Sequence, residues 1–163
     1  MVESSAITGL AGLDATDRAI LETLQADGNF SNAALARRVN LSPPATHARV
    51  RRLEEQGYIR QYTALLDREK LGLDLLCFVQ ISMQVHYLTQ QDPLREAIRD
   101  LPEVLECHHL TGEYDYLLKI AVRNRQELER IVVGRLTTMP GVARIHTSLV
   151  FTEIKATTAL PLA

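Results

Sequence analysis

The stretch Ser42-Pro-Pro-Ala-Thr-His-Ala-Arg-Val-Arg-Arg-Leu-Glu54 decides the fold of the first third of this chain. Ser42 is a favoured helix N-cap, and a proline directly after it fits the first helical turn, where a backbone N–H lacks a partner anyway. We therefore expect a helix that runs to about Gln56, because Gly57 follows as a terminator. Just upstream, Asn40 suits a tight turn between two helices, since asparagine tolerates the left-handed conformation.

Two shorter helices are predicted before this one. The first begins after the cap Asp14, has Asp17 at its positive end, and ends at residues 27–29, Asp-Gly-Asn. The second follows the cap Ser31. Three short helices with a tight turn between the last two predict a helix-turn-helix, here in a winged-helix-like domain.

Helical periodicity divides the third helix into two faces. We expect Thr46, Val50 and Leu53 to pack on the first two helices. The opposite face has small residues near its start and arginine farther along, which lets a helix approach base edges while guanidinium groups bind guanine or phosphate. Helix N-termini also suit phosphate. The candidate DNA-binding residues are Ser31, Ser42, Pro44, His47, Ala48, Arg51 and Arg52.

Charge is unevenly distributed along the chain. The 163 residues contain 18 Lys+Arg and 20 Asp+Glu, a net charge of -2 that does not by itself indicate nucleic acid. Residues 31–60, however, hold six arginines and two glutamates, an excess of four positive charges. One interpretation is an ordinary solvated face on which Glu54 and Glu55 pair with arginines. The capped turn upstream favours DNA binding instead.

The second half of the chain follows a different period. From Leu75 to Val85, apolar residues recur at every second position, which indicates a β-strand. Helical stripes at 94–101 and 128–139 alternate with strands expected at 104–111, 116–122 and 142–154. This β-α-β-β-α-β order predicts a ferredoxin-like domain and an α+β chain.

These patterns predict the domain boundaries. We expect a flexible tail at 1–12, the helix-turn-helix domain at 13–60, a hinge strand or linker at 61–73, the ferredoxin-like domain at 74–155 and a second tail at 156–163, with a short strand near 58–63. The sheet keeps apolar residues such as Phe78 on the face that its helices do not cover. We expect a second copy to cover that face, so that a two-fold dimer meets a near-palindromic operator.

The turn Thr111-Gly-Glu-Tyr-Asp115 is a second candidate site. Gly112 allows the backbone to approach a ligand closely. Asp115 offers a carboxylate to an ammonium group, and nearby peptide N–H groups suit a carboxylate, so the turn can hold a zwitterion. The alternative is a plain β-hairpin in which glycine and aspartate serve only the turn.

Cysteine and histidine spacing predicts no metal site. Cys77 and Cys107 lie far apart in apolar runs, and we expect both to be small buried residues. In Cys107-His108-His109, neighbouring strand side chains point to opposite faces and cannot converge on a metal. The sequence has no Gly-rich phosphate loop, nucleophile elbow or HExxH motif. We therefore expect no metal, no cofactor and no enzyme active site.

Targeting signals are not evident in the sequence. Residues 1–12 lack the basic region of a signal peptide, and no apolar run approaches the roughly 18 residues of a membrane span. These features predict a cytoplasmic protein with no membrane partner.

In its motifs the chain resembles the Lrp/AsnC family, the feast/famine transcriptional regulators, over about residues 13–155. Asn40 replaces the glycine common in the helix turn, and residues 45–48 differ from the best-known members, so their operator sequence does not transfer. The matching stretches, in order and at the right spacing, are Leu13-Asp14-x-x-Asp17, Leu41-Ser42-Pro43, Arg49-Val-Arg-Arg-Leu-Glu54, Gly57-Tyr-Ile59, Tyr62-Thr-Ala-Leu-Leu66, Glu106-Cys-His108, Gly112-Glu-Tyr-Asp-Tyr-Leu-Leu118 and Leu136…Met139-Pro-Gly-Val142.

The resemblance implies a nucleoid-associated regulator that binds double-stranded DNA and responds to a small effector, usually an amino acid. It also implies homodimers that form through the C-terminal domain and assemble into tetramers or octamers, with the effector bound between dimers. The implied effector residues are Thr111, Gly112, Tyr114 and Asp115 in the turn, and Ser148, Leu149 and Val150 on the last strand.

Two other function classes remain open at this point. A sirohaem-decarboxylase-like enzyme has the same two-domain form, but the exposed arginine run of the third helix favours DNA. A stand-alone effector-binding module has no DNA-binding domain, whereas residues 13–60 predict one here.

Overall fold

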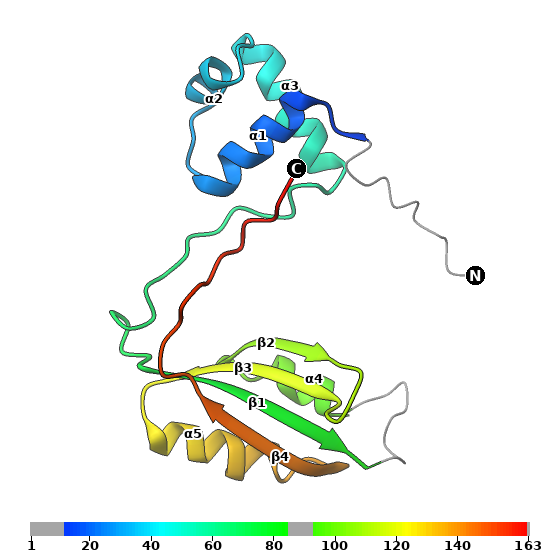
Figure 1. The fold of residues 1–163 in the computed structure, drawn as a ribbon, viewed down its shortest axis with the longest axis vertical. Helices are drawn as coiled ribbons and strands as arrows, with labels where there is room; N and C mark the ends of the chain where they lie inside the picture. Colours follow the sequence, from blue (N-terminus) through cyan, green and yellow to red (C-terminus); the bar gives the residue numbers. More distant parts are fainter. Residues whose placement is uncertain (1–11, 85–92, 163) are drawn as a thin grey trace, which may run out of the picture. The chain divides into compact units, whose positions relative to one another are not determined.

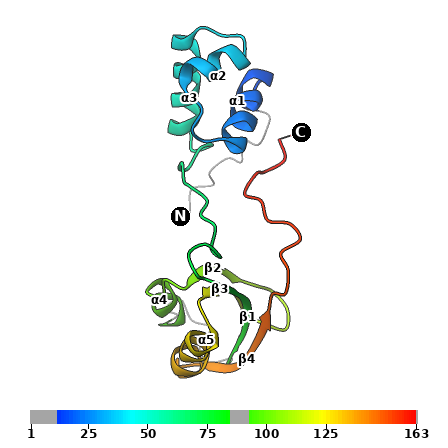
Figure 2. The ribbon, with the colours of Figure 1, turned by 90° about the vertical axis from the view of Figure 1, so that its left-hand side faces the viewer.

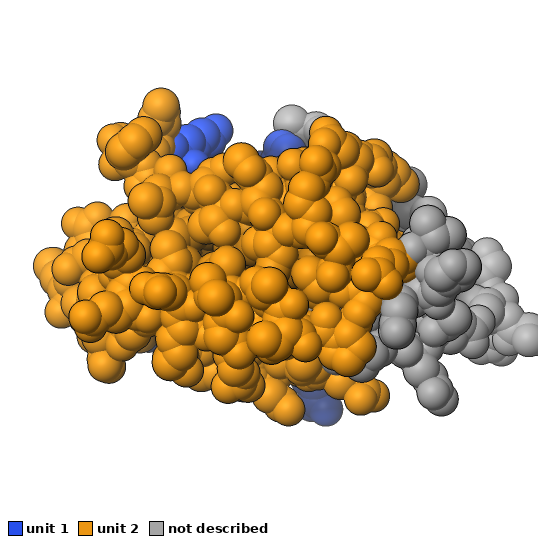
Figure 3. Space-filling view, turned by 90° about the horizontal axis from the view of Figure 1, so that it is seen from below, with its two compact units in different colours: residues 1–65, 155–163 blue, residues 66–154 orange. Residues whose placement is uncertain are grey.

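The computed structural model describes residues 12–84 and 93–162, which form two compact units (Figures 1 and 3). Unit 1 comprises residues 1–65 and 155–163, and unit 2 comprises residues 66–154. Most of the predicted N-terminal tail, Val85 and the side chain of Leu94 lie outside the described residues. Within the described residues, no helix combines the length and the apolar character needed to cross a membrane.

Unit 1 contains the three predicted helices. The side chains of Asp14, Ser31 and Ser42 each accept the backbone N–H three residues farther on, as expected of N-caps. Asp14 and Asp17 form a reciprocal capping box, and Asn40 is left-handed with φ 54°. The helices are α1 (Ala15–Ala26), α2 (Asn32–Arg38) and α3 (Pro43–Glu55).

The core of unit 1 joins the three helices. Thr46 and Leu53 of α3 are fully buried, and Val50 packs beside them, as the periodicity predicted. The C-terminal segment of the chain also belongs to this unit. Leu162 packs against the core cluster, and Gln25 of α1 binds the backbone of Leu160 through both of its side-chain polar atoms, at 2.6 and 3.1 Å.

Unit 2 is a four-stranded antiparallel sheet in the order β2-β3-β1-β4. Its two helices lie on one face of the sheet (Figures 1 and 2), which confirms the predicted β-α-β-β-α-β domain. The elements are β1 (Leu75–Met83), α4 (Pro93–Arg99), β2 (Val104–His109), β3 (Tyr116–Val122), α5 (Arg125–Ile131), its continuation as the π-helix η3 (Val132–Leu136), and β4 (Val142–Leu149).

The two faces of the sheet differ as the period of two predicted. Val79, Ile81 and Met83 of β1 are buried in the core with Ile98 from the α4 region and Ile131 of α5. Phe78 points to the other face and is 36% exposed. Within this single chain, that face carries an apolar side chain that the helices leave uncovered.

Three local predictions were wrong. Residues 58–63 form no strand, because a strand needs a neighbour for its backbone groups and none pairs with this segment in the described part of the chain. β4 ends at Leu149, not near residue 154, because its pairing with β1 ends there, opposite Cys77 and close to the start of β1. Cys107 is exposed because β2 is an edge strand, whereas Cys77 lies on the central β1 and is buried.

Candidate DNA-binding surface and effector site

The outward face of α3 carries most of the candidate DNA-binding residues. The fully buried Thr46 and Leu53 fix which side of the helix faces the core. The small side chains near the start of α3 therefore lie on the surface, with arginine one to two turns farther along. The exposed candidates on or beside α3 are Ser31, Ser42, Pro44, His47, Ala48, Arg51 and Arg52.

Arg51 extends from this face into solvent. Its Nε donates to Oε1 of Glu55 one turn later, at 2.8 Å, and the two side chains are 70% and 63% exposed. Such a solvated pair contributes little free energy. The Arg51 guanidinium can therefore exchange this carboxylate for a phosphate or a base at small cost.

Arg49 and Arg52 are turned toward α1. Arg49 Nη1 donates to Asp14 Oδ2 at 2.6 Å and to Asp17 Oδ1 at 2.8 Å. Arg52 Nη2 donates to Asp17 Oδ2 at 2.5 Å. The Asp17 side chain is only 2% exposed. Sequence reasoning did not foresee this network, because 32 to 35 residues separate the partners.

The network changes the electrostatics of the surface. The Asp17 backbone N–H and, after it, the Arg49 guanidinium hold the pKa of Asp14 below its ordinary value. Hydrogen bonds to Asp14 and then to Asp17 raise the pKa of Arg49. Once these two aspartates are counted with residues 31–60, the local excess of four positive charges falls to two.

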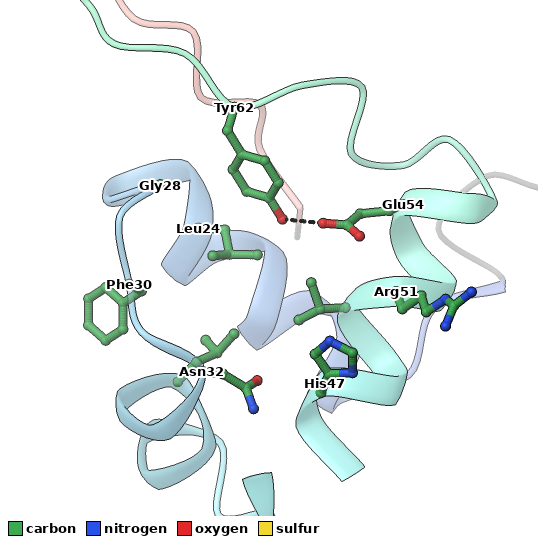
Figure 4. Close-up of a pocket in the computed structure, with 10 residues that line it drawn as sticks. Leu24, Gly28, Phe30, Asn32, His47, Arg51, Glu54 and Tyr62 are labelled. Atoms are coloured by element: carbon green, nitrogen blue, oxygen red, sulfur yellow. Dashed lines mark hydrogen bonds between the residues drawn. The ribbon is translucent and has the colours of Figure 1, made fainter. Parts of the chain in front are cut away.

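A pocket of about 490 Å³ lies beside α3 (Figure 4). Leu24, Leu35 and Val50 contribute apolar surface to its lining. At one side, the Tyr62 hydroxyl donates to Glu54 Oε1 at 2.8 Å, and burial together with this carboxylate raises the pKa of Tyr62 to about 12. The hydrogen bond fastens the start of the linker to α3, the helix that carries most of the candidate DNA-binding residues.

The predicted effector turn lies against β1 in unit 2. Gly112 has φ 124°, and nothing lies within 4 Å of where a Cβ would be, so space beside its backbone is open. Asp115 has a structural role: its N–H donates to Ile81 O at 2.9 Å, and its Oδ2 accepts the Met83 N–H at 2.7 Å. These bonds coincide with a shift of strand register between Ser82 and Met83.

Two residues of β4 that the sequence analysis missed also lie at this turn. Arg144 Nη2 donates to Glu113 Oε1 at 2.5 Å, and its guanidinium lies 5.1 Å from the centre of the Tyr114 ring. The rings of Tyr114 and His146 are 6.4 Å apart. The sequence carried no signal for this cluster, because it depends on the order of the strands in the sheet.

The other predicted effector residues, on the last strand, lie farther along the sheet. Ser148 is opposite Phe78 of β1 and Leu149 is opposite Cys77, whereas the turn lies at residues 81–83. Three to six residues along β1 correspond to about 10–20 Å at the rise of a strand. One protomer therefore does not bring Ser148, Leu149 and Val150 to the turn.

The histidines of β2 serve local contacts on opposite faces of the strand, as predicted. His108 Nε2 lies 3.0 Å from Glu106 Oε2, and His109 stacks on Tyr116 with ring centroids 5.0 Å apart. Within the described residues, no cluster of histidine, cysteine and carboxylate side chains is arranged to hold a metal ion.

A helix-turn-helix unit followed by a ferredoxin-like unit defines a two-domain class of DNA-binding regulators, and comparison with known proteins identifies the family. Residues 13–60 match the profile described as winged helix-turn-helix DNA-binding, and residues 76–160 match the Lrp/AsnC ligand binding domain. The chain belongs to the Lrp/AsnC family of DNA-binding transcriptional regulators.

Individual relatives agree over nearly the whole chain. The leucine-responsive regulatory protein of Escherichia coli strain K12 is 40% identical over 160 residues, which are 98% of this chain and 97% of that protein. A Neisseria meningitidis transcriptional regulator, solved in complex with L-Met, is 40% identical with a TM-score of 0.84, over 92% of this chain and 97% of that one. An AsnC family regulator from Agrobacterium tumefaciens is 31% identical with a TM-score of 0.85, over the same shares. The chain is a regulator and not an enzyme, and nothing in the comparisons supports the sirohaem-decarboxylase alternative.

Proposed function

We propose that this regulator recognises its operator through the exposed face of α3 and that its effector is an apolar L-amino acid. The DNA part of the proposal rests on one observation: burial of Thr46 and Leu53 turns Pro44, Ala48 and Arg51 outward together. Small side chains permit close approach to the major groove, and arginine then reaches guanine or phosphate. DNA as the partner also assigns the protein to the cytoplasm.

Selection of bound sequences from a random duplex pool tests the DNA proposal. Two-fold related DNA-binding units require two inverted half-sites separated by whole helical turns. Enrichment of such a near-palindrome is expected. Enrichment of single unpaired sites would contradict the dimeric arrangement. Enrichment of no sequence at all would contradict sequence readout by α3.

The effector proposal is supported by the relatives. A leucine-responsive protein and a regulator solved with L-Met are each 40% identical to this chain. Leucine and methionine share a zwitterionic head and have apolar side chains of similar size, branched in leucine and unbranched in methionine. We therefore assign this chain an effector of the same chemical class.

The turn at Gly112–Asp115 offers partners for the zwitterionic head. A buried ammonium and a buried carboxylate each need a partner, because an unpaired charge is very costly away from water. Asp115 supplies a carboxylate, and the open backbone beside Gly112 gives access to peptide N–H groups. For the apolar side chain we assign Leu149 and Val150, with Ser148, from a second copy, since the same copy holds them at least about 10 Å away along the sheet.

Calorimetry with leucine and with methionine tests this site. Asp115→Asn is the informative variant, because the amide keeps an oxygen for the Met83 N–H while it removes the charge that binds ammonium. Asp67→Asn is a matched control: Asp67 also accepts backbone N–H groups, but in the linker turn. We expect effector binding to be lost in the first variant and kept in the second. Equal affinity in both variants and the parent would leave Asp115 as a turn residue only.

A further inference from the structure

Asp17 is a nearly buried carboxylate in the first turn of α1, and α3 supplies most of its hydrogen bonds. Oδ1 accepts from Arg49 at 2.8 Å, and Oδ2 accepts from Arg52 at 2.5 Å and from the Asp14 backbone N–H at 3.3 Å. A buried carboxylate is tolerated only when it is paired in this way. Asp17 therefore fixes the positions of both guanidinium groups.

The three arginines of this run are consequently not equivalent. Among the described residues, Arg51 pairs only with the exposed Glu55 on its own helix. Arg49 is shared between Asp14 and Asp17, and Arg52 binds Asp17 while its side chain remains 46% exposed. Arg52 is thus close to the candidate DNA-binding face of α3 yet tied to α1.

We propose that Asp17 is a positioning residue of the DNA-binding unit, which withholds Arg52 and Arg49 from DNA and leaves Arg51 as the arginine of this run that meets the operator. The proposal rests on DNA binding through α3. A mobile guanidinium group binds phosphates of any sequence, so it adds affinity without discrimination. By holding two such groups, Asp17 raises the ratio of operator binding to non-specific binding.

The first test asks whether Arg52 contacts DNA in the native protein. Arg52→Gln in the full chain removes the charge but keeps an amide donor for Asp17. We expect the dependence of operator affinity on salt to stay as in the parent. If Arg52 neutralised a phosphate, the slope of log K against log salt would become shallower by about 0.9 per DNA-binding unit, and that result would overturn the proposal.

The second test releases Arg52. Asp17→Asn is nearly isosteric and removes the anion, so the half-exposed guanidinium becomes available to phosphate. We expect the salt slope to steepen by about 0.9 per unit, which is an extra loss of roughly 3.5-fold in affinity between 50 and 200 mM salt. Binding to unrelated duplex DNA at low salt should rise more than operator binding, so the specificity ratio falls.

Matched variants separate this mechanism from a general change of charge. Glu55→Gln removes one negative charge from the same unit, as Asp17→Asn does. The Glu55 carboxylate, however, is exposed and pairs with Arg51. The Asp17→Asn, Arg52→Gln double variant should regain the parental slope. Equal effects of Asp17→Asn and Glu55→Gln on the specificity ratio, or a double variant as steep as Asp17→Asn, would overturn the proposal. If circular dichroism shows Asp17→Asn unfolded, Arg52→Gln decides alone. A parent chain without any operator preference would instead refute the proposed function.

Discussion

Replacement of Arg51 by alanine is the most direct test of the recognition surface. The change should leave the fold almost untouched, because the side chain is 70% exposed and its pair with Glu55 joins residues one turn apart on one helix. Exposed pairs of this kind contribute about 0.3–0.5 kcal/mol, and alanine is the best helix former. We therefore expect a loss of less than about 0.5 kcal/mol in the free energy of unfolding.

The expected effect on DNA binding is larger. If Arg51 binds a guanine edge through two hydrogen bonds, its loss costs about 1–3 kcal/mol per DNA-binding unit, or roughly 5- to 150-fold in affinity. The loss should then be confined to the operator. If Arg51 touches only phosphate, affinity should fall about equally on all sequences, and the salt slope should become shallower by about 0.9.

Fluorescence anisotropy can separate these outcomes. The operator and an unrelated duplex of equal length are titrated at several salt concentrations, with stability followed by thermal unfolding. Arg123→Ala is the matched control, since Arg123 also pairs with a glutamate four residues later but lies in unit 2. Parental affinity of Arg51→Ala on both duplexes, with the fold intact, would refute the assignment of this face of α3 to DNA.

Four further outcomes follow from the structure. Leu53→Ala should lower the free energy of unfolding of unit 1 by about 2–5 kcal/mol, because the side chain is fully buried in α3; denaturant titration measures this, and a change below 1 kcal/mol would contradict the core assignment. Phe78→Asp should reduce the size of the assembly in light scattering, since it places a charge on the apolar sheet face that we expect a second copy to cover; an unchanged mass would exclude that face from the interface. Asp14 has a folded pKa below its ordinary 3.8, so the stability that it contributes is fully present above pH 3.8 and is lost as the pH falls through the lowered folded pKa. Between about pH 5 and 2 the melting temperature should therefore fall less steeply for Asp14→Asn than for the parent. Gln25→Ala should lower the stability of unit 1 by up to about 1 kcal/mol, because its hydrogen bonds to the Leu160 backbone are exposed, and equal melting of this variant and the parent would show that the C-terminal segment is held by packing alone.

Local chemistry accounts for what the sequence predicted well. The helix caps Asp14, Ser31 and Ser42 each act on an N–H three residues away, and the left-handed Asn40 serves its own turn. The change in the spacing of apolar residues at Leu75, from a helical period to a period of two, is set by residues within one element. Such features were predictable because every interaction behind them lies within a few residues along the chain.

The candidate sites were only partly predictable for the same reason. Periodicity determined which face of α3 is buried, and so it found Pro44, Ala48 and Arg51. It also grouped Arg52 with Arg51, since both lie toward the outward side of the helix. At the predicted effector turn, Arg144 and His146 were missed because their proximity to Tyr114 follows from the pairing of β4 with β1.

The sequence by itself determined the three helices of unit 1, the β-α-β-β-α-β order of unit 2, the two-domain class and the outward face of the third helix. Only the tertiary structure decided that Arg49 and Arg52 belong to Asp17, 32 and 35 residues away, that Cys107 lies on an exposed edge strand, and that Ser148 lies opposite Phe78 and away from the turn. Propensity, capping and periodicity act over a few residues and are written in consecutive positions. The choice of partner for a buried charge, or of neighbour for a strand, depends on which surfaces pack together, and that is settled only when the whole unit has folded.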